Sequence, residues 1–171
     1  MRIIFSAANM FKLFAEGNFK TPSFADNNTR IRWYPPNTSF TKLNFDGLVL
    51  TDNKASSGFI LRNSEGSPIL ASTKNVGVSN VLRAEAFALR VGLHATLLHG
   101  HLNIIVEGDS KILIDNINNK CSVPWKIQTL VRDIKILASK FHNIKFNHVW
   151  RETNFAADAV ANLGHSIPVA S

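Results

Sequence analysis

The order of apolar segments between residues 41 and 165 constrains the fold more than any other feature of this chain. Three short strand-like segments come first, and the turn-forming sequence NSEGS joins the second to the third as in a β-hairpin. Helix-like and strand-like segments then alternate along the chain. The predicted elements are strands at residues 41–47, 57–62 and 68–73, a helix at 79–100, a strand at 102–109, helices at 111–119 and 124–141, a strand at 143–151 and a helix at 154–164. This order predicts an α/β fold with a mixed five-stranded sheet flanked by helices, in which three antiparallel strands are followed by parallel strands.

The first predicted strand alternates between apolar and polar side chains. Leu43 and Phe45 lie on one face, and Asn44 and Asp46 lie on the other. Gly47 is predicted to end this strand in a turn.

The ends of two predicted helices carry specific signals. Ser79 or Asn80 is suited to cap the helix at 79–100, and Gly100 is suited to end it. Asn154 is predicted in the same way to be the N-cap of the closing helix, with a contact to substrate as the alternative.

The chain is long enough for one domain with a terminal extension, and we place that domain at residues 41–165. Residues 1–40 are rich in turn-forming residues and contain Pro35 and Pro36, so they are predicted to be a poorly ordered N-terminal extension or linker. Residues 166–171 are predicted to be a C-terminal tail.

Cysteine content and hydropathy limit the compartment and the partners. Cys121 is the only cysteine, which excludes a disulfide or a thiolate metal cluster within the chain. We therefore expect an intracellular location, nuclear or cytoplasmic, and targeting to an organelle stays open because no acid precedes Glu16. No apolar run approaches the roughly 20 residues that span a bilayer. We expect no membrane partner, and we expect a monomer.

The net charge of +7 is concentrated in one part of the chain. Residues 111–151 hold eight Lys or Arg against two acids, whereas residues 41–110 hold six of each. A basic block favours nucleic acid as a partner, because neutralising phosphates is the main source of non-specific affinity. A basic surface that only keeps the protein soluble explains the charge equally well, so charge alone does not decide.

One acid in the closing helix has no obvious partner. Asp158 lies among four alanines, and no basic residue lies on the same helix. A buried or half-buried carboxylate needs a cation or a metal ion, whereas an exposed one needs neither. Three other acids stand where they could share a site with it: Asp46 on the first strand, Glu85 near the start of the long helix, and Asp109 at the end of the fourth strand.

Each of these four acids has an ordinary explanation by itself, as a turn residue, a helix cap or a solvated side chain. Taken together they predict a metal site, because the sheet places Asp46 beside Asp109 and the two helices can bring Glu85 and Asp158 to the same edge. Carboxylates gathered in this way raise one another's pKa unless a cation relieves the repulsion. An all-oxygen ligand set favours Mg²⁺ or Mn²⁺, and the lack of cysteine disfavours zinc.

Four short blocks resemble the signature blocks of type 1 ribonuclease H. They are KLNFDG, RAEAFAL, VEGDS and HVWRETNFAADAVANLG, and they occur in the expected order on the expected elements. The match is close to the reverse-transcriptase-like domains of plant retroelements. The segment RWYPPNTSFTKLNFDG also resembles the Trp…Pro-Pro lead-in that is usual in those domains. The resemblance covers residues 33–165 and implies a ribonuclease H-like fold; residues 1–32 carry none.

The resemblance implies a metal-dependent endoribonuclease that cuts the RNA strand of an RNA–DNA hybrid and leaves 3′-hydroxyl and 5′-phosphate ends. Such enzymes use two Mg²⁺ ions, for which Mn²⁺ can substitute. The resemblance implies that Asp46 contacts both ions, that Asp109 and Glu85 complete the shell around one, and that Asp158 helps to hold the other. Arg151 would take an auxiliary role on phosphate, as in archaeal-type relatives. The 2′-hydroxyl would identify the RNA strand, and backbone contacts would leave little sequence preference.

Two features depart from the family pattern. HVWRETN is too short for the flexible His loop of many members, so the auxiliary role is assigned to Arg151. His148 is expected to be a packed or half-exposed strand residue, with a functional contact as the alternative. NNKCSVPW is shorter than the basic protrusion with which some members grip the hybrid, so tight unaided binding is in doubt. Trp33, Trp125 and Trp150 are expected to be core or lid residues rather than platforms for stacking bases.

Two other functions stay open. A catalytically silent nucleic-acid-binding domain derived from a retroelement would bind hybrids with steep salt dependence but without turnover. A related 3′→5′ exonuclease would also cluster acids on such a sheet, but would not cut a hybrid whose ends are blocked.

Overall fold

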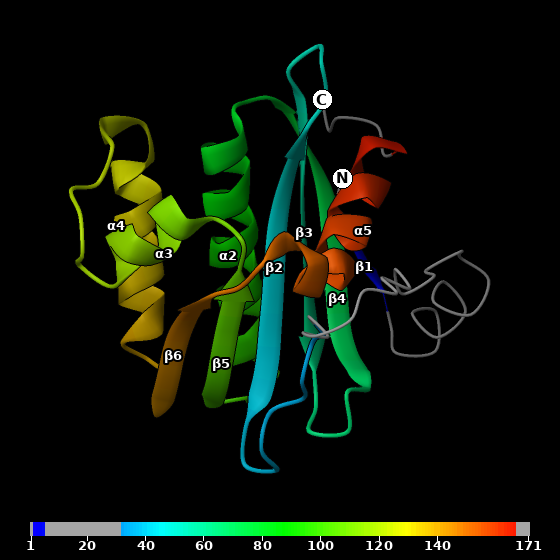
Figure 1. Ribbon diagram of the computed structural model, residues 1–171, viewed down its shortest axis with the longest axis vertical. Helices are drawn as coiled ribbons and strands as arrows, with labels where there is room; N and C mark the ends of the chain where they lie inside the picture. Colours follow the sequence, from blue (N-terminus) through cyan, green and yellow to red (C-terminus); the bar gives the residue numbers. More distant parts are fainter. Residues whose placement is uncertain (1, 6–31, 167–171) are drawn as a thin grey trace, which may run out of the picture.

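The computed structural model describes residues 2–5 and 32–166. Helices cover both faces of one twisted sheet; in Figure 1 the strands run through the centre, with α3 and α4 to the left and α5 to the right. The strands are β1 (Arg2–Phe5), β2 (Thr41–Val49), β3 (Lys54–Arg62), β4 (Pro68–Val78), β5 (Asn103–Gly108) and β6 (Asn143–His148). The helices are α2 (Val81–Leu98), α3 (Lys111–Ile117), α4 (Gln128–Ala138) and α5 (Phe155–Leu163), with single 3₁₀ turns η1 (Trp125–Ile127), η2 (Arg151–Thr153) and η3 (Gly164–Ser166).

The predicted five-stranded mixed sheet is confirmed. Strands β2, β3 and β4 are antiparallel neighbours, β5 pairs in parallel with β2, and β6 pairs in parallel with β5. A sixth strand was not predicted: β1 pairs antiparallel with the outer side of β4, giving the order β1-β4-β3-β2-β5-β6. The prediction of an N-terminal extension without regular structure is therefore incomplete, because the apolar run at its start extends the sheet. Residues 6–31 and 167–171, the rest of the predicted extension and tail, lie outside the described residues.

The alternation of β2 and β3 sorts the core into two layers. On one face the sheet packs against α2, with α4 packed on α2 in turn, and on the other face it packs against α5. The first layer includes Leu43, Phe45, Phe59, Leu61, Leu89, Leu93, Ile104 and Val106. The second layer is small and consists of Ile60, Ala71, Ala156, Ala157 and Val160. Small alanines on α5 let that helix lie close to the sheet.

Two glycines permit these close helix–strand contacts. The prediction that Gly47 ends the first strand is wrong, since β2 continues through it to Val49. A Cβ atom at Gly47 would lie 2.3 Å from the backbone nitrogen of Glu85, so the start of α2 rests directly on β2. A Cβ atom at Gly58 would lie 2.4 Å from the backbone nitrogen of Ala161, on the α5 side.

Helix α2 begins and ends close to where the sequence predicts. Asn80 is its N-cap, and the Asn80 side chain accepts a 2.9 Å hydrogen bond from the Arg83 backbone N–H. Gly100 follows the helix with φ 77°, a conformation that glycine adopts without steric cost. Among residues 2–5 and 32–166, no helix is both long and apolar enough to span a bilayer.

Candidate metal centre

Three of the four predicted acids meet beside the two central strands β2 and β5. The parallel pairing of β2 with β5 ends at Asn44 and Glu107, and Asp46 and Asp109 each follow two residues later. Glu85 joins them from α2. One carboxylate oxygen from each of Asp46, Glu85 and Asp109 lies within 4.8 Å of the other two. The structure therefore brings these three predicted residues together.

Glu85 reaches the other two acids because α2 lies so close to β2. It is the fifth residue of α2 and is 7 % exposed, which excludes the alternative of a solvated side chain near the start of the helix. The absence of a side chain at Gly47 lets the backbone of Glu85 approach the strand that carries Asp46.

Burial without a cationic partner perturbs two of these acids strongly. Burial, and then the charges of Asp109 and Asp158, raise the pKa of Asp46 to about 8. Burial is also the main cause that raises the pKa of Glu85 to about 7, against a hydrogen bond from Ser110 that lowers it. Among the described residues, none of the ion pairs includes Asp46, Glu85 or Asp109. Such a cluster is suited to a divalent cation, which would replace the missing positive charge.

Asp158 lies beside this group rather than within it. Its charge raises the pKa of Asp46, but its oxygens are not among those that lie within 4.8 Å of one another. Its side chain is 37 % exposed and has a cationic partner, Arg151, whose guanidinium lies 3.3 Å away. The prediction that a shared metal ion is the partner of Asp158 therefore leaves out this cation. Arg151 lies in η2, before α5 begins, so a search for basic residues on the helix of Asp158 does not find it.

Asn154 is a site residue whose side-chain role the sequence did not predict. It occupies the N-cap position of α5, and its carbonyl oxygen accepts from the backbone N–H groups of Ala157 and Asp158, but its side chain makes no capping hydrogen bond. The side-chain amide instead donates to the carbonyl oxygen of Phe45 at 2.9 Å and to the Asp109 carboxylate at 3.4 Å. Asn154 is 1 % exposed, so it belongs to the interior of the site.

A buried set of polar side chains continues from the site along the α5 face of the sheet. We call it the polar strip; it consists of Lys42, Asn44, Arg62 and Glu107. Lys42 pairs with Glu107 at 2.7 Å, and Arg62 donates to the Asn44 side-chain oxygen at 2.7 Å. Trp33 covers the strip, with its indole N–H donating to Asn44 at 3.1 Å and its ring 3.4 Å from the Arg62 guanidinium.

The polar strip has a definite electrostatic cost. Burial lowers the pKa of Arg62 to about 10, and the charge of Glu107 opposes this shift. The alternation of Lys42 and Asn44 with Leu43 and Phe45 was visible in the sequence, but alternation alone does not reveal that a polar face is buried. The segment before β2, which contains Trp33, was the sequence feature that could have indicated this burial.

Several aromatic side chains are more exposed than predicted. Trp125 and Trp150 are 79 % and 67 % exposed, so neither is a core residue. Trp33 is partly buried over the polar strip, as a lid residue would be. His148 is exposed at the end of β6, 6.1 Å from the Trp150 ring, with one ring nitrogen 3.2 Å from the carbonyl oxygen of Asp109.

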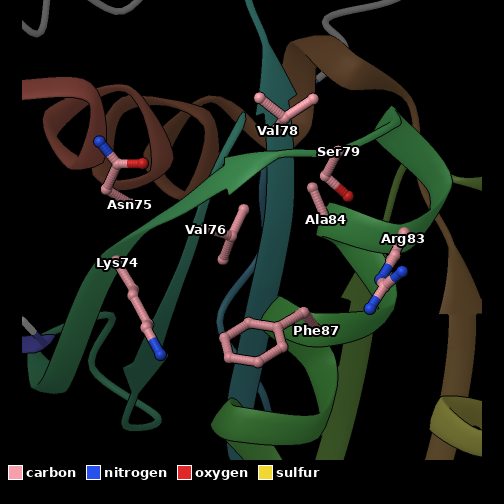
Figure 2. Close-up of a pocket in the computed structure, with 8 residues that line it drawn as sticks. All are labelled: Lys74, Asn75, Val76, Val78, Ser79, Arg83, Ala84 and Phe87. Carbon is pink, nitrogen blue, oxygen red and sulfur yellow. The ribbon is translucent and has the colours of Figure 1, made fainter. Parts of the chain in front are cut away.

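A pocket of about 350 Å³ lies behind the start of α2, between that helix and β4. Figure 2 shows Lys74 and Arg83 on its two sides with the Phe87 ring between them. The Lys74 ammonium lies 5.1 Å from the centre of that ring. Ala84 also lines the pocket and directly precedes Glu85, so the pocket borders the start of the helix that carries this acid.

Comparison with known proteins places this arrangement in a family. A family model described as reverse transcriptase-like matches residues 44–164. A relative from Arabidopsis thaliana, provisionally named a ribonuclease H protein, is 27 % identical over 138 residues, or 80 % of this chain. The chain spans 22 % of the length of that relative.

Solved ribonucleases H share the fold. Ribonuclease H1 from Halobacterium salinarum NRC-1 is 25 % identical with a TM-score of 0.70, and the match covers 74 % of this chain and 98 % of that one. The N-terminal ribonuclease H domain of Rv2228c from Mycobacterium tuberculosis has the same identity and TM-score, with 74 % and 94 % covered. The LC11 ribonuclease H1, solved in complex with an RNA/DNA hybrid, is 21 % identical with a TM-score of 0.67 over 72 % of this chain and 94 % of that one, which shows the fold alone. With its ribonuclease H fold and a family match over most of its length, the chain belongs to the reverse transcriptase-like family of ribonuclease H domains.

Proposed function

We propose that this domain is a metal-dependent endoribonuclease that hydrolyses the RNA strand of RNA–DNA hybrids. The observation that carries the proposal is the meeting of Asp46, Glu85 and Asp109 within 4.8 Å, without a cationic side chain paired to any of them among the described residues. A ribonuclease H domain that had lost its chemistry would have no reason to retain three acids at such a cost in desolvation.

The donor set fits Mg²⁺. It offers only carboxylate oxygens, which hard divalent cations prefer, and the raised pKa values of Asp46 and Glu85 describe acids that lack a counter-charge. Asp46, Glu85 and Asp109 would hold one ion, and Asp158 together with Asp46 would hold a second. Bound ions of this kind neutralise charge on the phosphodiester and lower the pKa of an attacking water.

The side chains around these acids suit a sugar-phosphate backbone. The Arg151 guanidinium is 71 % exposed, and its planar fork can donate two parallel hydrogen bonds to a phosphate. Lys74 and Arg83 offer two further cations beside the start of α2. Contacts of this kind position a duplex without reading its sequence, so we expect little sequence preference. An RNA/DNA hybrid is the ligand named for LC11 ribonuclease H1, which shares this fold, and we propose the same substrate class for this chain.

The direct test is incubation of the purified protein with an end-labelled RNA–DNA hybrid in Mg²⁺ and in EDTA. We expect internal cuts in the RNA strand that need Mg²⁺, that also occur when the hybrid ends are blocked, and that leave 3′-hydroxyl ends. Asp109→Asn should abolish them. Cleavage that persists in that variant, or no cleavage at high protein concentration, would contradict the proposal.

One observation favours a second candidate, a domain that binds nucleic acid without cutting it. Asp158 pairs with Arg151 and lies outside the group of three acids. If that pair never opens, the second ion has no complete site. This candidate predicts hybrid binding that weakens steeply with salt and no turnover in either Mg²⁺ or Mn²⁺.

A further inference from the structure

Asn154 touches three of the four elements that carry the acids. It lies at the start of α5, where its carbonyl oxygen accepts a 3.2 Å hydrogen bond from the backbone N–H of Asp158. Its side-chain amide donates to the carbonyl oxygen of Phe45 on β2, the residue before Asp46. The same nitrogen donates to the carboxylate of Asp109, which follows β5.

The hydrogen bonds of the Asn154 side chain leave it no free polar atom. Both hydrogens of its amide nitrogen have acceptors, and its oxygen accepts from the Asn44 amide at 3.3 Å. Asn44 is held in turn, because its own oxygen accepts from Arg62 at 2.7 Å and from Trp33 at 3.1 Å. Rotation of the Asn154 amide would break several buried hydrogen bonds at once, so its orientation is fixed.

We propose that Asn154 is a positioning residue for the metal centre, holding the Asp109 carboxylate at a fixed distance from the β2 backbone next to Asp46. The inference rests on the proposed function, since it assumes that Asp46 and Asp109 share an ion. A hydrogen bond from a neighbouring side chain fixes the direction in which a ligating carboxylate presents its oxygen. Nothing else among the described residues is hydrogen-bonded to both Asp109 and the β2 backbone.

The test measures ion binding directly, by calorimetric titration of the full chain with Mn²⁺. The variant is Asn154→Ala, and the matched control is Asn116→Ala. Asn116 is also 1 % exposed, but its amide donates to Cys121 and Ser122 in the link between α3 and α4 rather than to an acid. Both variants lose a buried asparagine, so both should lower the melting temperature.

Only Asn154→Ala is expected to weaken Mn²⁺ binding, by about tenfold or more, as for other residues that orient metal ligands. In the cleavage assay the Mg²⁺ concentration for half-maximal rate should rise, and excess Mg²⁺ should restore much of kcat. If Asn154→Ala does not fold cooperatively, Asn154→Ser is measured instead, because its shorter side chain keeps a polar atom but cannot span Phe45 and Asp109.

Mn²⁺ affinity equal to that of the wild type in a folded Asn154 variant would overturn the inference and leave the proposed function standing. Equal loss of affinity in the Asn116 control would also overturn it, since the effect would then be one of general stability. A wild-type protein that binds no Mn²⁺ would overturn the proposed function itself, and the inference with it.

Discussion

The guanidinium of Arg151 lies 3.3 Å from the carboxylate of Asp158, at the rim of the candidate metal centre. Both side chains are substantially exposed, so the pair adds at most about 1 kcal/mol to stability. A pair this weak can open when a phosphate or a cation competes for either partner. If the proposed function is right, this pair is the resting arrangement of two groups that would act separately during cleavage.

Arg151→Ala tests this separation. We expect the melting temperature to change little, whereas kcat/KM on an RNA–DNA hybrid should fall about tenfold or more, because a charge-assisted hydrogen bond to phosphate is lost. Arg151→Lys should recover only part of the loss, since an ammonium cannot form the bidentate contact. Unchanged kcat/KM in Arg151→Ala would remove the residue from the site.

The raised pKa values predict how stability depends on pH in the absence of metal. Asp46 and Glu85 have pKa values of about 8 and about 7 in the folded protein, above their usual 3.8 and 4.5. The folded state therefore binds more protons than the unfolded state over this interval. The stability these groups contribute is fully present below pH 4 and is lost as the pH rises towards 8.

Thermal melts in EDTA from pH 5 to pH 8 measure this dependence. The melting temperature of the wild type should fall relative to that of Asp46→Asn as the pH rises. Saturating Mg²⁺ should reduce the difference, because a bound cation favours the ionised acids. Parallel curves for the two proteins in EDTA would show that Asp46 does not titrate in this range.

Asp109→Asn should separate stability from activity. The charge of Asp109 raises the pKa of both Asp46 and Glu85, so its removal relieves repulsion in the metal-free protein. We expect a melting temperature a few degrees higher in EDTA, together with loss of cleavage and of stabilisation by Mg²⁺. A lower melting temperature in EDTA would mean that the hydrogen bond from Asn154 outweighs the repulsion.

The ion pair between Lys42 and Glu107 predicts strong coupling between two substitutions. Lys42→Met alone leaves Glu107 buried without its partner and should cost about 3–5 kcal/mol in urea unfolding. Combining it with Glu107→Gln should recover part of the loss, because no unpaired carboxylate then remains, although Arg62 loses the charge that opposes the fall in its pKa. Additive effects of the two substitutions would show that the pair contributes no specific interaction.

The pocket behind α2 predicts a change in the salt dependence of binding. Replacing Lys74 and Arg83 together with alanine removes the two cations that line this pocket. If both contact phosphates, the slope of log affinity against log salt should fall by about 2, similarly for hybrids of different sequence. An unchanged slope would place the duplex elsewhere on the surface.

Strand order and the three central acids could be predicted because both depend on local patterns. Asp46 lies on an alternating strand, Asp109 directly follows a mostly apolar one, and these two strands pair in parallel. The role of the Asn154 side chain could not be predicted in this way. A polar residue before a helix is usually its cap, and only the approach of β2 and β5 turns this side chain inwards.

Burial of the polar strip was the other feature that could not be predicted from the sequence. Lys42 and Glu107 carry charges, which normally indicate that a side chain is exposed to solvent, and the two residues are far apart in the sequence. Their burial depends on a distant cover, Trp33, and on Arg62 from the neighbouring strand. Strand β1 could not be predicted either, because its four residues form no pattern long enough to identify a strand and its partner.

Because Trp33 stacks on Arg62, the folding unit includes residues that precede β2. A protein fragment trimmed to begin at Thr41, the first residue of β2, would remove the indole that covers Arg62, a side chain that is 7 % exposed in the intact chain. Water would then reach the side-chain amides of Asn44 and Asn154, which link Arg62 to the Asp109 carboxylate. Recombinant versions meant to report on ion affinity should keep the stretch from Arg32 onward.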